Sequence, residues 1–291
     1  MTPFELVEPA SLDEAVRLLD ASDASVRAAG GCTALLLMMK AGVLKPRRLV
    51  SLRRIEPRYF AIERESQHMR LGAQVTLTQL EHSPLVRSAF PGMCRALNRL
   101  ANVRVRNVAT LGGNLAHADP HMDLPALLTA LEASIVVQGA AGTRTLPIGE
   151  LISGYMETTL AGDELIAEVH VPMRETRRAI YRKVTTRSAD DWPALGIAVA
   201  LDMGEDGKVS DARVVVSAAV DRPTRLPAVE ALVRGARLDD ALLARAGDAA
   251  AAQELIGDQH GSAPYKRELM RVHVGRALRE AAAAPIGAVS Q

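Results

Sequence analysis

A pair of adjacent glycines, Gly112-Gly113, constrains the fold of this chain more than any other sequence feature. It lies inside the continuous run Thr-Leu-Gly-Gly-Asn-Leu-Ala-His-Ala-Asp-Pro-His-Met-Asp-Leu-Pro at residues 110–125. Neighbouring glycines adopt positive φ without strain and let a main chain come into contact with a ligand. Since such a turn exposes backbone N–H groups to an anion, we expect an anion site here.

A second pair, Gly30-Gly31, lies about eighty residues earlier in the chain. It follows a predicted strand at residues 25–29 and precedes an apolar run at residues 34–40, which Thr33 is expected to cap as a helix. A glycine turn between a strand and a helix is the usual context for phosphate binding. Together the two pairs predict one large phosphate-bearing cofactor.

Composition limits the possible partners. The 291 residues, 48% of them hydrophobic, suit two domains, and the net charge of +1 offers no electrostatic footprint for nucleic acid or an anionic membrane. We expect no membrane span and no signal peptide, and therefore a cytoplasmic protein, because no long apolar run or basic leader appears. Cys32 and Cys94 alone cannot supply the four thiolates that an iron–sulfur cluster normally takes.

Periodicity and turn signals predict an α+β protein. Helices are expected at residues 11–20, 34–40, from 76, from 91, 124–133, 227–234, 239–255 and 264–283. Strands are expected at residues 25–29, 48–52, 69–73, 134–138, 165–171, 197–203 and 213–220. The last two strands flank an Asp-Gly hairpin signal, and a polar, basic stretch at residues 173–178 marks the expected domain boundary.

Several motifs together resemble the FAD-binding medium subunit of the xanthine dehydrogenase and carbon monoxide dehydrogenase family, the molybdenum hydroxylases. These motifs spread over nearly the whole chain, at residues 29–40, 104–109, 110–115, 123–125, 181–184, 191–193 and 265–267. The resemblance implies an FAD-binding domain of two α/β subdomains of the vanillyl-alcohol-oxidase (PCMH) type at residues 1–174, split near residue 54. It also implies a C-terminal domain with an antiparallel sheet and helices at residues 175–291.

The resemblance further implies an electron-transfer role within a complex. A large partner subunit would hold molybdopterin, a small one would hold two [2Fe–2S] clusters, and FAD in this chain would pass electrons to NAD or another acceptor. No residue of this chain would act on the organic substrate. A stand-alone FAD oxidase or dehydrogenase of the same cofactor fold and a flavin-free assembly subunit are the alternatives.

Carried over position by position, the resemblance assigns a set of cofactor-binding residues. Two pyrophosphate-binding loops would comprise Ala29, Gly30, Gly31, Cys32, Thr33 and Ala34, and then Thr110, Gly112, Gly113 and Asn114. His117 would face the cofactor, Asp123 would accept hydrogen bonds from cofactor hydroxyl groups, Lys183 would lie near the flavin ring, and Ile166 or Leu165 would pack on the ring face.

The sequence alone also allows simpler structural roles for several of these residues. Asp123 can cap the helix that follows it, and Lys183 can be a solvated residue of an alternating strand. Arg104 and Arg106 fit a basic surface strand. The alternating side chains of His117, Asp119, His121 and Asp123 raise a metal site, but Pro120 interrupts that geometry, so we expect no metal.

Overall fold

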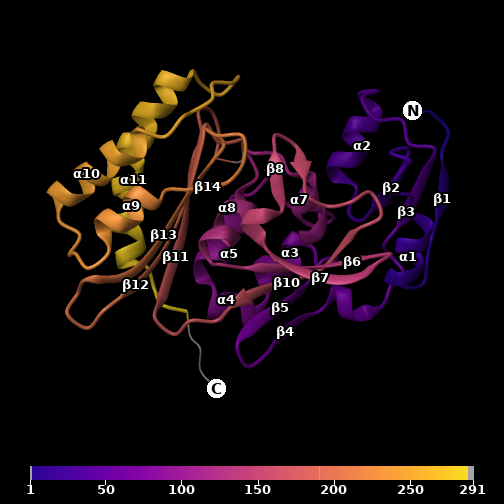
Figure 1. The fold of residues 1–291 in the computed structure, drawn as a ribbon, viewed down its shortest axis with the longest axis horizontal. Coiled ribbons are helices and arrows are strands. Elements are labelled where there is room, and N and C mark those ends of the chain that lie inside the picture. Colours follow the sequence, from indigo (N-terminus) through magenta and orange to yellow (C-terminus); the bar gives the residue numbers. More distant parts are fainter. Residues whose placement is uncertain (1, 190, 288–291) are drawn as a thin grey trace.

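A small parallel sheet and two helices form the N-terminal part of the protein. The structure, a computed structural model, describes residues 2–189 and 191–287. The sheet has the order β1-β3-β2, with β1 (Glu5–Val7), β3 (Arg48–Ser51) and β2 (Val26–Ala29) all parallel. Helices α1 (Leu12–Leu18) and α2 (Thr33–Lys40) connect the strands (Figure 1).

The predicted start of α1 is confirmed. Ser11 Oγ accepts a hydrogen bond from the N–H of Glu14 at 3.1 Å, and Glu14 Oε2 accepts one from the N–H of Ala10 at 2.8 Å. These bonds satisfy N–H groups that have no partner inside the helix. Leu12 and Val16 bury the opposite face, so the capping pattern and the apolar spacing agree.

A five-stranded antiparallel sheet forms the middle of the molecule, in the order β4-β5-β10-β6-β7. Its strands are β4 (Ile62–Arg64), β5 (His68–Gly72), β10 (Leu165–Pro172), β6 (Ser134–Gly139) and β7 (Gly142–Pro147). The short helix η1 (Pro57–Phe60) precedes β4. The elements between the strands are α3 (Leu77–His82), α4 (Pro84–Ala89), α5 (Pro91–Asn98), α6 (Val103–Arg106), α7 (Leu111–His117), α8 (Asp123–Ala130), η2 (Ile148–Glu150), and the strands β8 (Ile152–Gly154) and β9 (Glu157–Thr158).

The C-terminal part is a four-stranded antiparallel sheet with helices on its outer face (Figure 1). The strands, in sheet order, are β11 (Arg177–Val184), β12 (Leu195–Met203), β13 (Val209–Ser217) and β14 (Thr224–Arg225). The helices are α9 (Pro227–Val233), α10 (Asp240–Ala251) and α11 (Ala263–Ala283).

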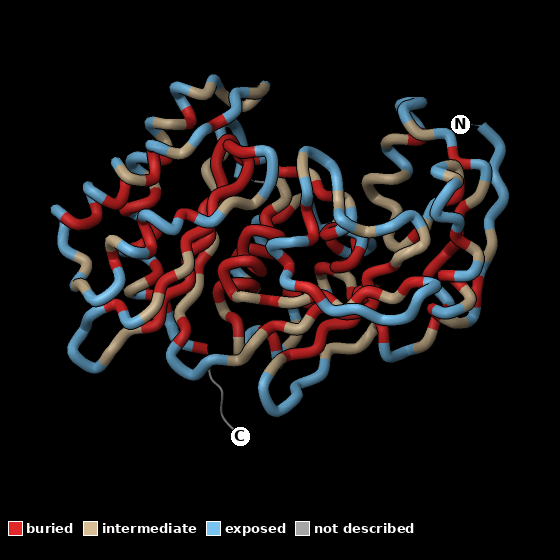
Figure 2. The backbone as a smooth tube through the Cα atoms, in the orientation of Figure 1, coloured by how far each residue is buried: buried red, intermediate tan, exposed pale blue. Residues whose placement is uncertain are grey.

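Both faces of this sheet are buried, which explains why β12 is hydrophobic without interruption. Ile197, Val199 and Leu201 belong to the core shared with the outer helices. Ala198 and Ala200 point the other way, as alternation along a strand requires, and belong to the central core. Figure 2 shows the buried colour running along the strands of this sheet. The C-terminal sheet therefore packs against the middle of the molecule, and Val215 and Tyr181 contribute to the same contact.

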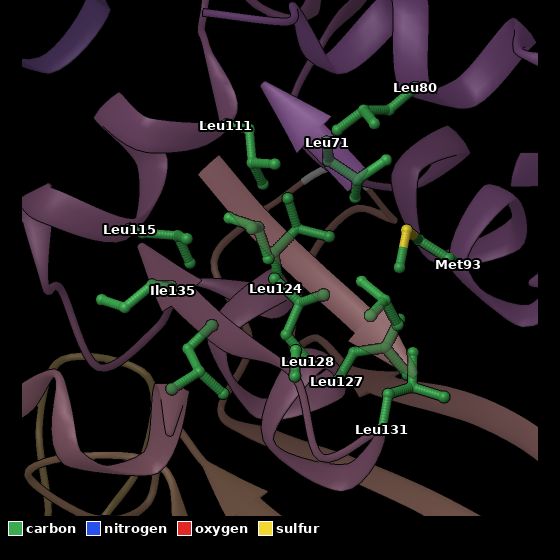
Figure 3. Close-up of a cluster of buried hydrophobic side chains, with 14 of the residues drawn as sticks. Leu71, Leu80, Met93, Leu111, Leu115, Leu124, Leu127, Leu128, Leu131 and Ile135 are labelled. Carbon is green, nitrogen blue, oxygen red and sulfur yellow. The ribbon is translucent and has the colours of Figure 1, made fainter. Parts of the chain in front are cut away.

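The central core anchors the two helices that carry the predicted site residues Gly112, Gly113, Asn114, His117 and Asp123. Leu111 and Leu115 of α7 and Leu124 and Leu127 of α8 are completely or almost completely buried, and Figure 3 shows them converging with Leu71. Fully burying one such side chain contributes about 1.5–3 kcal/mol. The polar sides of α7 and α8 are thus held in place by their leucines.

Three local expectations are wrong. Gly112-Gly113 does not form a turn but lies inside helix α7, and neither glycine has positive φ. Residues 103–106 form helix α6, not a strand, and Arg106 is buried. Thr33 does not cap α2, because the cap position belongs to Cys32, whose side chain makes no capping bond. For Gly112 the reason is close packing with a distant segment, because an added Cβ would lie 2.8 Å from the Cβ of Ala73.

The sheets suggest where the parts of the chain divide. The parallel sheet ends at Ser51 and the five-stranded sheet begins at Ile62, while β10 ends at Pro172 and β11 begins at Arg177. We propose domain limits near residues 54 and 174 on this basis. Among the described residues, no helix combines the length and the apolar character needed to span a bilayer.

Candidate functional site

The first glycine pair is required by close contact between two chain segments. A Cβ atom on Gly31 would lie 2.0 Å from the carbonyl oxygen of Val108, and one on Gly30 would lie 3.0 Å from Thr110 Oγ1. At position 31 only glycine permits this approach, whereas the contact at Gly30 is tight. In the loop between β2 and α2, the residue with a left-handed backbone conformation is Cys32, with φ 59°, and not either glycine. The loop between β2 and α2 therefore rests directly on the segment that leads into α7.

The start of α2 presents backbone N–H groups that have no acceptor in the described part of the chain. The first N–H of this helix with a protein acceptor is that of Leu36, which donates to the carbonyl oxygen of Cys32 at 3.0 Å. The N–H groups from Gly31 to Leu35 make no such bond. Free N–H groups and the positive end of the helix dipole attract an anion. This loop can hold a phosphate group.

The second glycine segment differs, because its first N–H groups are already used. Leu111 donates to Val75 O at 2.9 Å, Gly112 to Ala73 O at 2.7 Å, and Gly113 to Thr110 Oγ1 at 3.2 Å. The expectation that this pair offers free N–H groups to an anion is therefore not met. A Cβ on Gly112 would lie 2.8 Å from the Cβ of Ala73, so this glycine serves close packing of α7.

Side chains near the second segment keep polar atoms free. Asn114 donates from Nδ2 to Met122 Sδ at 3.1 Å, but its buried Oδ1 has no hydrogen-bond partner among the described residues. The buried Oδ1 of Asp123 has none either. A buried polar atom without a partner costs about 1–3 kcal/mol, so these two oxygens are candidate acceptors for a ligand or an ordered water.

Asp123 and Lys183 form a buried ion pair between α8 and β11. Lys183 Nζ donates to Asp123 Oδ2 at 3.1 Å and to the carbonyl oxygen of Arg99 at 3.1 Å. Burial raises the pKa of the Asp123 carboxyl, and the neighbouring Lys183 charge opposes this only in part. Asp123 is not a helix cap, since Met122 holds that position, and Lys183 is not solvated, since its side chain is 5% exposed.

Tyr181 belongs to the same cluster and was not singled out from the sequence as a site residue. Its hydroxyl lies 3.3 Å from Ser217 Oγ, and burial, followed by the charge of Asp123, raises its pKa well above the usual value. Tyr181 and Lys183 are two residues apart on β11 and so point to the same side. This two-residue spacing is the sequence signal that could have identified Tyr181 as a site residue.

These features surround one cavity of about 750 Å³, a size typical of cofactor pockets. Its walls include most of the predicted site residues, namely Gly30, Gly31, Cys32, Thr33, Ala34, Thr110, Gly113, Asn114, His117, Asp123 and Lys183. They also include residues with no predicted role, among them Leu37, Met38, Leu77, Val105, His121, Met122 and Trp192.

Three predicted residues lie outside the wall. Ala29 ends β2 and is buried beside α2, and Gly112 packs on Ala73. Ile166 is buried in the central core on β10, the middle strand of its sheet, and Leu165 packs in the N-terminal core. Both faces of β10 are covered at this point, which keeps these two side chains away from the cavity.

The histidines at the rim have different environments. Burial lowers the pKa of His117, which lies in the last turn of α7. His121 hydrogen-bonds instead to two carboxylates, Asp119 and Asp258. Within residues 2–189 and 191–287, no group of three or more His, Cys, Asp or Glu side chains is arranged to hold a metal ion.

Comparison with known proteins places this cavity in context. Residues 2–174 match the family model of the FAD-binding domain in molybdopterin dehydrogenase, and residues 179–281 match that of the CO dehydrogenase flavoprotein C-terminal domain. The nicotine 6-hydroxylase medium subunit of Paenarthrobacter nicotinovorans is 33% identical over 94% of this chain and 96% of its own length. The carbon monoxide dehydrogenase medium chain of Hydrogenophaga pseudoflava is 32% identical over 96% of both chains.

Solved structures agree with these matches. A structure of carbon monoxide dehydrogenase from Hydrogenophaga pseudoflava aligns with a TM-score of 0.92 and 33% identity, covering 97% of this chain and 99% of the other. Quinoline 2-oxidoreductase from Pseudomonas putida 86 aligns with a TM-score of 0.91 and 27% identity, covering 97% and 98%. The expected α+β architecture is confirmed, and the chain belongs to the FAD-binding medium subunits of the molybdenum hydroxylase family, which are oxidoreductase components.

Proposed function

We propose that this chain is the FAD-binding electron-transfer subunit of a molybdenum hydroxylase complex. A large molybdopterin subunit and a small subunit with [2Fe–2S] clusters are its proposed partners, and NAD or another acceptor is proposed to receive the electrons. The observation that carries this proposal is the cavity of about 750 Å³. There a loop of free backbone N–H groups meets two buried oxygens that have no hydrogen-bond partner within residues 2–189 and 191–287.

The residues of the cavity fit FAD. The N–H groups from Gly31 to Leu35 and the dipole of α2 suit a pyrophosphate, and no lysine is needed because such neutral donors each contribute about 1 kcal/mol net. Asn114 Oδ1 and Asp123 Oδ1 are free to accept hydrogen bonds from cofactor hydroxyl or N–H groups. We therefore propose both segments, Gly30–Ala34 and Thr110–Asn114, as cofactor-binding elements.

The cavity wall also includes residues that suit a flavin ring. The Lys183 ammonium is buried with Asp123, and Trp192 and Met122 supply flat or apolar surface on the same wall. When bound, FAD supplies chemistry in which single electrons and electron pairs are exchanged. The chain's own contribution is to bind the cofactor, to place a fixed positive charge beside it through Lys183, and to keep Asp123 out of water.

The names of the relatives support the proposed partners. The matched proteins are named as medium subunits or medium chains of dehydrogenases and hydroxylases, and they are matched along nearly their whole length. The two cysteines of this chain leave cluster binding to another polypeptide.

Purification of the full chain tests the cofactor assignment. The purified chain should take up one FAD, visible as a flavin absorption band, and should not oxidise substrates by itself. A chain that stays colourless after FAD addition would support the flavin-free assembly role instead. Turnover of an organic substrate by the isolated chain would support a stand-alone oxidase or dehydrogenase.

A second experiment tests partners and acceptor. Co-expression with the neighbouring reading frames should yield a complex that contains molybdenum and four iron atoms per FAD, as two [2Fe–2S] clusters require. Anaerobic mixing of the FAD-loaded chain with NADH should bleach the flavin if NAD is the acceptor. Lack of bleaching with NADH, together with substrate-driven bleaching in the complex, would point to a different acceptor.

A further inference from the structure

The imidazole of His121 lies between two carboxylates. Its Nδ1 is 2.9 Å from Asp119 Oδ1, and its Nε2 is 2.8 Å from Asp258 Oδ2. A neutral imidazole carries only one N–H, so one of its nitrogens would face a carboxylate oxygen with a lone pair. Only the protonated ring donates to both partners. A carboxylate oxygen at each ring nitrogen therefore favours the positively charged form of His121.

Lys266 supplies a second positive charge next to the Asp258 carboxylate. Lys266 Nζ donates to Asp258 Oδ2 at 2.6 Å and to the carbonyl oxygen of Ala218 at 2.8 Å, and the Lys266 side chain is completely buried. The N–H of His260 donates to Asp258 Oδ1 at 2.7 Å. With His121 protonated, two carboxylates face two cations, and the cluster is neutral. Without that proton, it carries one uncompensated negative charge.

This cluster joins distant parts of the chain. Asp119 and His121 lie in the loop between α7 and α8, whereas Asp258 and Lys266 lie in the C-terminal region. A main-chain bond supports the same junction, since the N–H of Ala218 donates to the carbonyl oxygen of Pro120 at 2.9 Å. We call the contacts of Asp119, His121, Asp258 and Lys266 the histidine latch.

The latch lies directly at the cavity. The loop that it fixes connects His117 with Met122 and Asp123, and all three line the cavity together with His121 itself. Trp192, another wall residue, meets the His121 ring edge-on at a centroid distance of 5.7 Å. The contact with Asp258 therefore holds a loop that forms part of the cavity wall.

We propose that His121 is a positioning residue for the cofactor, whose protonated ring latches the α7–α8 loop to Asp258 and so keeps the cavity wall in its cofactor-binding shape. This inference rests on the proposed function, since it takes FAD as the occupant of the cavity. His121 need not touch the cofactor, because it acts through the loop that carries Met122 and Asp123.

The groups around His121 determine how the latch responds to pH. Burial lowers the pKa of His121, but the hydrogen bonds to Asp119 and Asp258 outweigh burial and raise it above the ordinary 6.5. The ring of His260 lies 5.3 Å away, Lys266 acts through Asp258, and His117 and Asp191 share the cavity wall. Since the folded-state pKa is raised, the latch is complete below 6.5 and is lost as the pH rises through the raised value.

Cofactor binding tests this dependence in the full chain. One linked proton changes affinity by at most about tenfold per pH unit, so FAD should bind on the order of tenfold more weakly at pH ~8.5 than at pH ~6. H121Q should bind FAD weakly at both pH values. H170Q is the matched control, because His170 Nε2 lies 3.0 Å from Glu168 Oε2 on β10, away from the cavity. H170Q should bind FAD with the affinity and the pH dependence of the wild type.

The outcomes separate the two proposals. If the wild type binds no FAD at either pH, the proposed function fails. If the wild type binds FAD and H121Q keeps the same affinity and the same pH dependence, the latch is overturned while the proposed function stands.

Tryptophan fluorescence tests the latch in the absence of cofactor. Its first readout needs only the wild-type chain, so it does not depend on whether a variant folds. Trp192 is the only tryptophan of the chain, and a protonated imidazole quenches an adjacent indole. The emission of the apo wild type should rise with a pH midpoint above 6.5. D258N should lower that midpoint, H121Q should abolish the transition, and H260Q should keep it. A midpoint at or below 6.5, or a transition that survives in H121Q, overturns the inference.

Discussion

Lys183 Nζ lies 3.1 Å from Asp123 Oδ2, and the two side chains, only 5% and 3% exposed, join the C-terminal sheet to the first turn of α8 at the wall of the cavity. The pair satisfies one carboxylate oxygen of Asp123 and leaves the other, Oδ1, without a hydrogen-bond partner in the part of the chain that the structure describes. Burying a charge is costly unless it is paired, so Lys183 keeps Asp123 in place and available to a ligand.

Replacement of Lys183 by methionine should destabilise the protein. K183M leaves a buried carboxylate without its cation, and breaking such a pair typically costs about 3–5 kcal/mol. The pKa of Asp123, already raised by burial, should rise further, and FAD affinity should fall. Urea unfolding of the apo chain and FAD titration measure the two effects.

The exposed pair Arg271–Asp248 supplies the control, because its side chains are 42% and 68% exposed. R271M should leave the unfolding midpoint unchanged, since solvent screens such pairs. Equal midpoints for K183M and the wild type would show that the buried pair contributes nothing to folding.

Gly31→Ala should disrupt the contact between the two loops of the cavity. The added Cβ would lie 2.0 Å from Val108 O, so the segments must separate. Overpacking of this kind costs about 1–3 kcal/mol, and we expect FAD affinity to drop at least about tenfold because the free N–H groups follow Gly31 directly. Thermal unfolding and FAD titration provide the readouts.

Gly149→Ala is the matched substitution at a site with room. Its Cβ would meet only Thr129 Cγ2 at 3.6 Å, an ordinary contact. G149A should therefore retain wild-type stability and FAD affinity. If G31A behaves like G149A, the close approach of the two loops is not needed for binding.

The sequence predicted those parts of the site that local patterns encode. Gly30-Gly31 follows a short strand and precedes a helix, and the structure has that order around a loop of free N–H groups. The interpretation of Gly112-Gly113 was wrong because a glycine needed for packing on Ala73 looks the same in sequence as one needed for a turn.

Residues whose role depends on distant partners were not predictable in this way. His121 meets Asp258, which lies 137 residues further along the chain. Arg106 looked like a surface residue because nothing nearby shows that Glu81 will neutralise it in the interior. Such pairings are set by the packing of whole elements, and no spacing rule records them.

Arg106 should tolerate neither methionine nor lysine. Its Nε donates to Glu81 at 2.9 Å, and its Nη1 donates to the carbonyl oxygens of Leu100 and Ala101 at 3.1 and 2.7 Å. R106M should cost about 3–5 kcal/mol. R106K should recover only part of this loss, because a lysine ammonium cannot reproduce the guanidinium fork. Since Leu100 and Ala101 line the cavity, both variants should also weaken FAD binding.

Arg104 provides the control on the same helix. It is exposed, and R104M should change neither the urea midpoint nor the FAD affinity. Full recovery of both quantities in R106K would contradict the role given to the guanidinium geometry.

Acid should destabilise the fold partly through Glu168. Burial raises the pKa of this carboxyl, but hydrogen bonds from His170 and Arg58 and the charge of Arg70 outweigh burial and hold the pKa below the ordinary 4.5. A lowered folded-state pKa means that the stabilisation is complete above 4.5 and is lost as the pH falls through the lowered value. E168Q should therefore be less stable than the wild type at pH ~7, and the two should converge in acid.

Urea unfolding at pH ~7 and pH ~3 measures this convergence. E254Q, at an exposed position, should follow the wild type at both pH values. The unfolding free energies of E168Q and the wild type could instead differ by the same amount at both pH values. Protonation of Glu168 would then not contribute to acid unfolding, and the contacts of Arg58 and Arg70 with its side chain would not depend on its charge.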